Sequence, residues 1–145
     1  MKNVLYQKDF VQWTEEQAQH LQKQELDAID WQNIQEEIAA LGRSEKHELE
    51  NRLEVLLEHL LKRCYINSTY DNRGWELTIK EQRKQMRRLL RASPSLKNYI
   101  ETIIQEIWLD ALSDVQDIYP NANFPENNLF FQDLETLLTE KFWQS

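Results

Sequence analysis

The stretch SEKHELENRLEVLLEHLLKRC, residues 44–64, decides the fold. Its leucines recur three or four positions apart, which predicts one apolar face on a helix of about 31 Å, at 1.5 Å of rise per residue. Ser44 has the side chain of a good N-cap, and Lys62 and Arg63 suit the negative end of the helix dipole. We expect this helix to be central, with the other segments packed against its leucines: Leu49, Leu53, Leu56, Leu57, Leu60 and Leu61.

Further apolar periodicity predicts an all-α, single-domain helical bundle of five main helices plus a short C-terminal helix. Besides the central one, the pattern places helices near residues 10–21, 31–41, 75–91 and 96–118, with the short one near 134–138. Asp9 and Asp30 are plausible N-caps. Gly42 stands where a left-handed residue would end the second helix, so a tight corner is expected between it and Ser44.

Two later boundaries have their own signals. Residues 65–74 lack any apolar period and are expected to form a loop. Ser93 and Pro94 predict a helix start, with Ser93 as the cap and Pro94 at the first helical position, where its missing N–H costs nothing. Tyr119-Pro120 should end the long fifth helix.

Composition limits the classes of function. The 145 residues suit one domain, 1–145, and two glycines with three prolines favour helices joined by short loops. A net charge of −8 repels phosphate, so nucleic-acid binding is not favoured. Cys64 is the only cysteine, which excludes an intrachain disulfide and a cysteine-based metal site. Neither a signal peptide nor a membrane span is evident, so a cytoplasmic protein without membrane contact is expected.

A series of short motifs spans nearly the whole chain. They are EEIAALGRSE at 36–45, LLEHLLK at 56–62, WELTIKEQR at 75–83 and SPSL at 93–96, with Asp9-Phe10 through Trp13 near the start and Phe142-Trp143 near the end. This series resembles the bacterial, mainly cyanobacterial, family called "domain of unknown function 29". Where that family usually shows Gln-Pro after the long helix, this chain has Ile66-Asn67. The resemblance implies an all-α fold and carries over no activity, cofactor or catalytic residue.

Charge is the strongest signal outside the apolar pattern. Residues 73–97 hold eight basic and two acidic side chains, a local charge of +6. Five of the basic residues share one face of the predicted 75–91 helix, and this face could bind an anion or nucleic acid through arginine. The favoured interpretation is that the face is neutralised within the protein by Glu106, Asp110, Asp114 and Asp117, or by Glu36 and Glu37, and a surface for a protein partner ranks second. The candidate binding residues are Lys80, Arg83, Lys84, Arg87 and Arg91.

Other candidates for chemistry have simpler structural explanations. His59 lies within the leucine-rich stretch and is expected to be a structural histidine, with Glu36 or Glu37 as its acidic partner. No histidine has a glutamate three positions before it, so no metal or other cofactor is expected. Cys64 is expected to be a small core residue, and the tryptophans are expected in the core, except that Trp143 must either dock or fray.

Three functional hypotheses follow. The leading one is a non-catalytic protein-interaction module, with a protein partner or self-association as its mode, because no convergent catalytic set is present. The second is a nucleic-acid-associated protein that uses the basic face. The third is an enzyme of unknown class, for which His59 and Glu37 form the best available acid–base pair.

Overall fold

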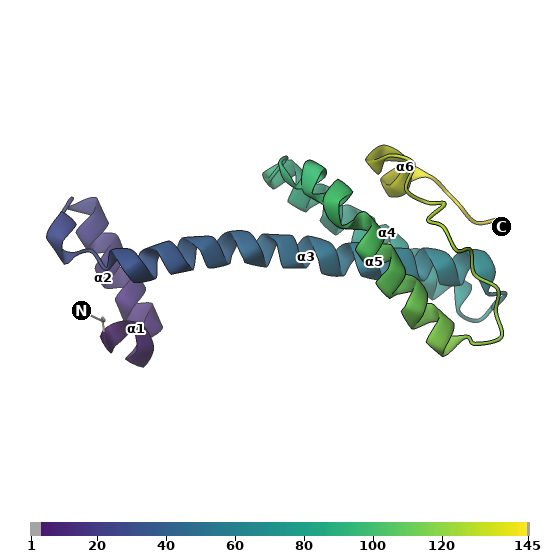
Figure 1. The fold of residues 1–145 in the computed structure, drawn as a ribbon, viewed down its shortest axis with the longest axis horizontal. Coiled ribbons are helices and arrows are strands. Elements are labelled where there is room, and N and C mark those ends of the chain that lie inside the picture. Colours follow the sequence, from purple (N-terminus) through teal and green to yellow (C-terminus); the bar gives the residue numbers. More distant parts are fainter. Residues whose placement is uncertain (1–3, 145) are drawn as a thin grey trace. The chain divides into compact units, whose positions relative to one another are not determined.

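The computed structural model describes residues 4–144 and is all-α, as predicted (Figure 1). Its elements are α1 (Val4–Lys8), α2 (Phe10–Gln22), the 3₁₀ helix η1 (Leu26–Ala28), α3 (Trp31–Tyr65), α4 (Asn72–Ala92), α5 (Leu96–Ile118) and α6 (Leu134–Thr139). The chain divides into two compact units, the N-terminal unit of residues 1–44 and the C-terminal unit of residues 45–145. The single-domain organisation predicted for 1–145 stays a prediction.

The central helix is longer than predicted. α3 runs without a break from Trp31 to Tyr65, so the predicted end at Gly42, the cap at Ser44 and the tight corner between them are wrong. Gly42 does not adopt a positive φ. A glycine inside a helix costs only about 1 kcal/mol relative to alanine, and the alanines and leucine before it favour continuation. Two of the five predicted main helices are therefore one.

The other boundaries are mostly confirmed. Asp9 caps α2 by accepting from the Gln12 N–H at 3.1 Å, and Asp133 caps α6 in the same way through Thr136. The prediction that Ser93 caps the next helix is wrong: Ser93 follows the last residue of α4, and α5 begins only at Leu96. The Ser93 carbonyl instead accepts from the Leu96 N–H at 3.0 Å, which closes a turn around Pro94.

The N-terminal unit is organised around the carboxylate of Asp30. Trp13 donates its indole N–H to Asp30 at 3.0 Å, and Gln17 accepts from the Asp30 backbone N–H at 2.7 Å. Asn33 donates its backbone and side-chain N–H groups to the same carboxylate, so Asp30 caps α3 as predicted. Burial opposes ionisation of Asp30, but the hydrogen bonds from Asn33 and Trp13 outweigh it and hold its pKa below the usual value.

The C-terminal unit has a conventional apolar core. All six leucines of the deciding stretch are fully buried, which confirms the face predicted from their spacing. They pack with apolar residues of α4, α5 and α6, of which Trp108 is the largest fully buried side chain. The Trp108 indole N–H still finds a partner, the Glu126 carbonyl, at 3.1 Å. Most of the apolar side chains of this unit are therefore enclosed by its own helices.

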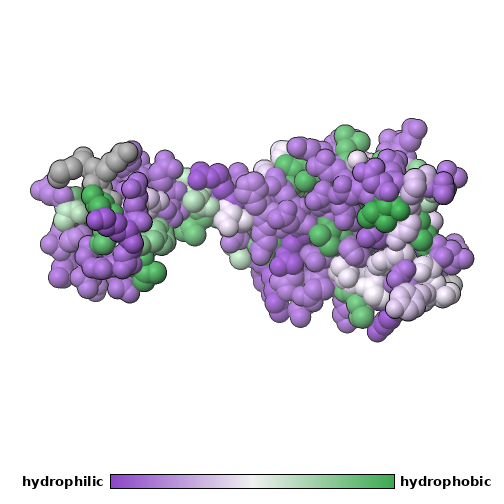
Figure 2. All heavy atoms as spheres, turned by 90° about the horizontal axis from the view of Figure 1, so that it is seen from below, coloured by the Kyte–Doolittle hydropathy of each residue, from purple (hydrophilic) through white to green (hydrophobic). Residues whose placement is uncertain are grey.

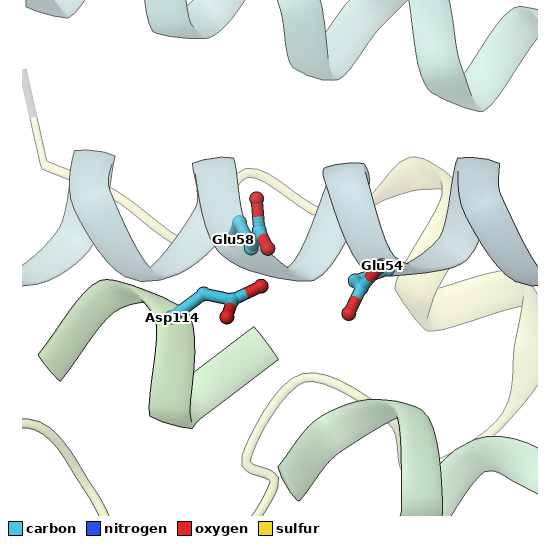
Figure 3. A group of neighbouring side chains, drawn as sticks. All are labelled: Glu54, Glu58 and Asp114. Atoms are coloured by element: carbon cyan, nitrogen blue, oxygen red, sulfur yellow. The ribbon is translucent and has the colours of Figure 1, made fainter. Parts of the chain in front are cut away.

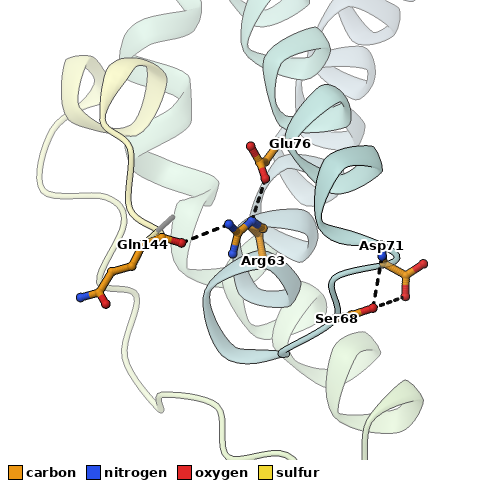
Figure 4. A network of polar contacts seen from close by, with 5 residues as sticks. All are labelled: Arg63, Ser68, Asp71, Glu76 and Gln144. Atoms are coloured by element: carbon orange, nitrogen blue, oxygen red, sulfur yellow. Dashed lines mark hydrogen bonds and ion pairs between the residues drawn. The ribbon is translucent and has the colours of Figure 1, made fainter.

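The C-terminal tail is tied to the end of α3 (Figure 4). Arg63 donates to Glu76 at 3.0 Å and to the Gln144 carbonyl at 3.1 Å, and its guanidinium lies 5.9 Å from the centre of the Trp143 ring. Trp143 therefore docks rather than frays. In the loop before α4, Ser68 and Asp71 bond each other through two contacts.

The tryptophans of the described residues differ in burial. The prediction of a core position is right for Trp13 and Trp108 and wrong for Trp31, which is 50% exposed.

Among residues 4–144, no helix combines the length and the hydrophobicity that crossing a lipid bilayer requires.

Candidate functional site

The basic residues of α4 have two different environments. Arg83 is buried, and its guanidinium donates to the Leu137 carbonyl at 3.0 Å and to the Glu140 carbonyl at 2.6 Å. Arg87 donates to the Leu138 carbonyl at 2.5 Å. The two arginines thus satisfy carbonyls at the C-terminal end of α6, which have no partner within that helix. Arg83 is not part of an exposed face, contrary to the expectation from helical spacing.

The remaining candidates, Lys80, Lys84, Arg87 and Arg91, are exposed on α4. Within residues 4–144, no ion pair joins them to the acidic residues of α5. The internal neutralisation considered from the sequence is therefore not formed through those pairs.

A hollow borders this basic face where α4, α5 and α6 meet, and we call it the α4–α6 cavity. It has a volume of about 490 Å³. Three cations line it, together with three leucines and one carboxylate: Arg87, Arg91, Lys97, Leu90, Leu134, Leu138 and Glu135. A second, smaller hollow of about 300 Å³ shares Arg87 and Leu138 with it and reaches Lys80 and Trp143. Four of the five predicted binding residues, Lys80, Arg83, Arg87 and Arg91, thus line these two hollows, whereas Lys84 lines neither.

An acidic cluster lies between α3 and α5 (Figure 3). Carboxylate oxygens of Glu54, Glu58 and Asp114 lie within 4.8 Å of one another. Burial, a hydrogen bond with Asp114 and the charges of Asp114 and Glu54 raise the pKa of Glu58 to about 7, against a small opposing effect of Lys62. Such oxygens can hold a hard divalent cation, but a proton shared between Glu58 and Asp114 satisfies the same pair. Sequence reasoning missed this cluster because it looked for glutamate–histidine pairs, while the signal was two glutamates four residues apart on α3.

The predicted partnership of His59 with Glu36 or Glu37 is wrong. The His59 Nδ1 atom lies 2.8 Å from the Val55 carbonyl, one turn earlier in α3, and burial lowers the pKa of the imidazole. Glu37 belongs to the N-terminal unit, where its carboxylate accepts a hydrogen bond from the Tyr6 hydroxyl. The Nδ1 atom of His59 therefore has a partner within its own helix, and the structural role expected for His59 stays a prediction.

Cys64 fits its predicted structural role. It is half-buried against the core, and burial raises the pKa of its thiol to about 11. A thiol that stays protonated at neutral pH is a weak nucleophile.

The N-terminal half of α3 carries an apolar face that the protein leaves uncovered. Ile34 is half-buried, but Trp31, Ile38 and Leu41 are 50%, 64% and 68% exposed. We call these four residues the N-terminal seam. The expectation of a core position is wrong for Trp31 in this face. The Trp13 ring of α2 packs against Tyr6 and Phe10 and donates to Asp30.

Comparison with known families gives one match. The family described as "Domain of unknown function DUF29" matches residues 5–143, nearly the full length of the chain. The chain belongs to this family. Searches of curated proteins and of solved structures find no match. The family description carries no activity, so the function of this DUF29 chain has to be inferred from the geometry above.

Proposed function

We propose that this DUF29 chain is a non-catalytic protein-interaction module, and that its N-terminal seam binds a basic amphipathic helix of another protein. The observation that carries the proposal is the exposure of the seam. Eight of the fourteen exposed large apolar side chains among residues 4–144 belong to the N-terminal unit, which is less than a third of the chain. Figure 2 shows apolar residues, in green, at the surface of this unit.

The spacing of the seam suits a helical partner. Trp31, Ile34, Ile38 and Leu41 follow one another at intervals of three, four and three residues, which is the a and d pattern of a coiled-coil seam. They extend over about 15 Å of helix, or roughly three turns. Gly42 lies beside the seam and lets a partner backbone approach closely, since no atom lies within 4 Å of the position its Cβ would take.

Charge favours a basic partner over a second copy of the same chain. Residues 1–44 contain four basic and eight acidic side chains, a net charge of −4. A second copy would bring the same negative charge to the interface, whereas lysine or arginine at the flanks of a partner helix would be attracted. The proposal includes a cytoplasmic location in a bacterial, mainly cyanobacterial, host, in line with the family resemblance.

Two features support a non-catalytic role. His59 and Glu37 are each bonded to a different partner, and the Cys64 thiol is held protonated by burial. The nucleic-acid hypothesis loses support because Arg83 is buried and Arg87 is bonded to α6.

Binding can be tested with two designed 21-residue helical peptides that carry leucine at a and d, one with lysine and one with glutamate at e and g. We expect the lysine peptide to bind in fluorescence anisotropy, more weakly as salt rises, and the glutamate peptide not to bind. Leu41→Glu should lower the affinity for the lysine peptide by at least about tenfold, because a charge would replace an interface anchor.

Ala39→Glu is the matched control, since Ala39 is exposed on the same helix but about 120° from the seam. It should leave the affinity within about twofold of the parent value. Equal losses in the two variants, or equal binding of both peptides, would contradict the proposal. A dimer in sedimentation equilibrium that Leu41→Glu dissociates would assign the seam to a second copy and overturn the basic partner.

A further inference from the structure

The α4–α6 cavity combines cationic and apolar side chains, which is the composition of a small-molecule site. We infer that it binds a small amphiphilic anion: a phosphate or carboxylate group joined to one short apolar group. This inference is independent of the function proposed for the N-terminal seam, because every residue that lines the cavity belongs to the C-terminal unit.

Charge is the first argument. Arg87, Arg91 and Lys97 line the cavity with only Glu135 to oppose them. Within residues 4–144, the side chains of Arg91 and Lys97 have no hydrogen bond or ion pair. Three cations around one concave surface repel one another, and an anion bound among them removes that repulsion. Arginine also offers paired N–H donors that match the oxygens of a phosphate or carboxylate.

The start of α5 adds to this potential. Lys97 is the second residue of this 23-residue helix, so its side chain leaves the backbone within the first turn. The side chain of the capping residue Ser95 makes no cap hydrogen bond. The positive end of the helix dipole therefore lies on the same side of the cavity as Lys97 and favours negative charge there.

The apolar lining is the second argument, because it distinguishes this cavity from a simple cluster of surface cations. Leu90 and Leu138 are buried members of the core, and Leu134 is half-buried against it. Together they form an apolar wall below the cations. A volume of about 490 Å³ lies within the range of about 300–1,000 Å³ that is usual for small-molecule sites. A bare phosphate would leave the partly exposed Leu134 side chain in contact with water, so a ligand with an apolar group fits better.

Arg87 links the cationic and the apolar sides of the cavity. Its bond to the Leu138 carbonyl fixes α6 against α4, and this contact positions the leucine wall opposite the free cations. The cavity is thus preformed by the contact that stabilises α6, which reduces the cost of ordering side chains when a ligand binds.

The experiment uses the full chain and three probes: phenyl phosphate, inorganic phosphate and benzyl alcohol. We expect phenyl phosphate to bind in isothermal titration calorimetry at least about tenfold more tightly than either fragment, because it uses both the cations and the leucines. The double variant Arg91→Gln, Lys97→Gln should lower the affinity for phenyl phosphate by at least about tenfold. Neither residue takes part in the core, so each variant should melt within a few degrees of the parent, which thermal melting checks.

The matched control is Lys84→Gln, Arg88→Gln, which removes the same charge from exposed positions on α4 outside the cavity. Its affinity should stay within about twofold of the parent value. Equal losses in the two double variants would mean that only net charge is sensed, and equal affinity for phenyl phosphate and inorganic phosphate would mean that the leucines contribute nothing. Either result, or the absence of binding at 10 mM probe (about −2.7 kcal/mol on the standard scale), overturns the inference.

The ligand could be a free molecule or the headgroup of a lipid. Flotation with phosphatidylcholine vesicles, with and without phosphatidic acid, separates these sources. Binding to the acidic vesicles that the Arg91→Gln, Lys97→Gln variant loses and the control retains would identify a lipid headgroup. Phenyl phosphate binding without vesicle binding would identify a soluble ligand.

Discussion

The two units of this protein are held together by different physics. Among residues 4–144, the C-terminal unit has 21 buried apolar residues in one cluster, whereas those of the N-terminal unit are Trp13 and Ile29. The N-terminal unit instead depends on directional hydrogen bonds that converge on Asp30. A large core stabilises a unit in proportion to the apolar area that it buries. A small unit buries a smaller fraction of its surface, so more of its apolar side chains remain exposed.

The same difference decides which surfaces are left open. The N-terminal unit exposes the N-terminal seam, and the C-terminal unit covers most of its apolar residues and has an open cavity beside its core.

Leu57→Ala should lower the free energy of unfolding of the C-terminal unit by about 3 kcal/mol, because it removes a fully buried side chain and leaves a cavity. Leu41→Ala, at a residue that is 68% exposed, should change it by no more than about 0.5 kcal/mol. Urea unfolding followed by circular dichroism measures both. Similar losses would mean that the N-terminal seam is covered in solution.

Asp30→Ala should lower the free energy of unfolding of the N-terminal unit by about 1–2 kcal/mol, because it removes the cap of α3 and leaves the Trp13 N–H without its partner. Hydrogen exchange should increase in α2 while the leucine-rich part of α3 stays protected. Asp27→Ala, at an exposed acid three residues earlier, is the control.

The same unit should weaken in acid. Since the folded pKa of Asp30 is lowered, its contribution is present above the ordinary pKa of 3.8 and is lost as pH falls through the lower folded value. Exchange rates in α2 that do not respond to pH after correction for intrinsic exchange would contradict the role of Asp30.

Glu58→Gln should have the opposite pH signature in the C-terminal unit. The folded pKa of about 7 lies above the ordinary 4.5, so the folded state binds the extra proton and stability falls as pH rises between these values. The substitution should therefore be near neutral at pH 4 and stabilising by about 1 kcal/mol at pH 8, a value reduced for solvent screening. Glu106→Gln, at an exposed position on α5, should show no such difference.

Gly42→Ala should stabilise α3 by about 0.5–1 kcal/mol, because the glycine lies within a helix and its added Cβ meets open space. Gln24→Gly is the counterpart: Gln24 has a φ of 57°, where glycine is favoured, so this substitution should also stabilise. A loss of thermal stability in Gly42→Ala would indicate that α3 bends at this residue.

Sequence patterns predicted features that are local to one helix, and they failed for features that depend on distant residues. The apolar period correctly predicted the buried face from Leu49 to Leu61, and local cap signals correctly predicted Asp9 and Asp30 as N-caps. Helix continuation through Gly42 was not predictable, because a penalty of about 1 kcal/mol is easily offset by neighbouring helix formers. The environments of Arg83 and Glu58 were not predictable, because their partners Leu137 and Asp114 lie more than 50 positions away in the sequence.

By itself, the sequence determined the helical class, the leucine face of α3 and the excess of positive charge on α4, because each of these follows from periods and charges within a single helix. Only the tertiary structure decided that Trp31, Ile38 and Leu41 stay exposed, that Arg83 and Arg87 hold α6, and that a cationic cavity forms beside Leu90 and Leu138. The physical reason is that a helix fixes which side chains share a face, while burial and pairing depend on whether another segment is long and apolar enough to cover that face.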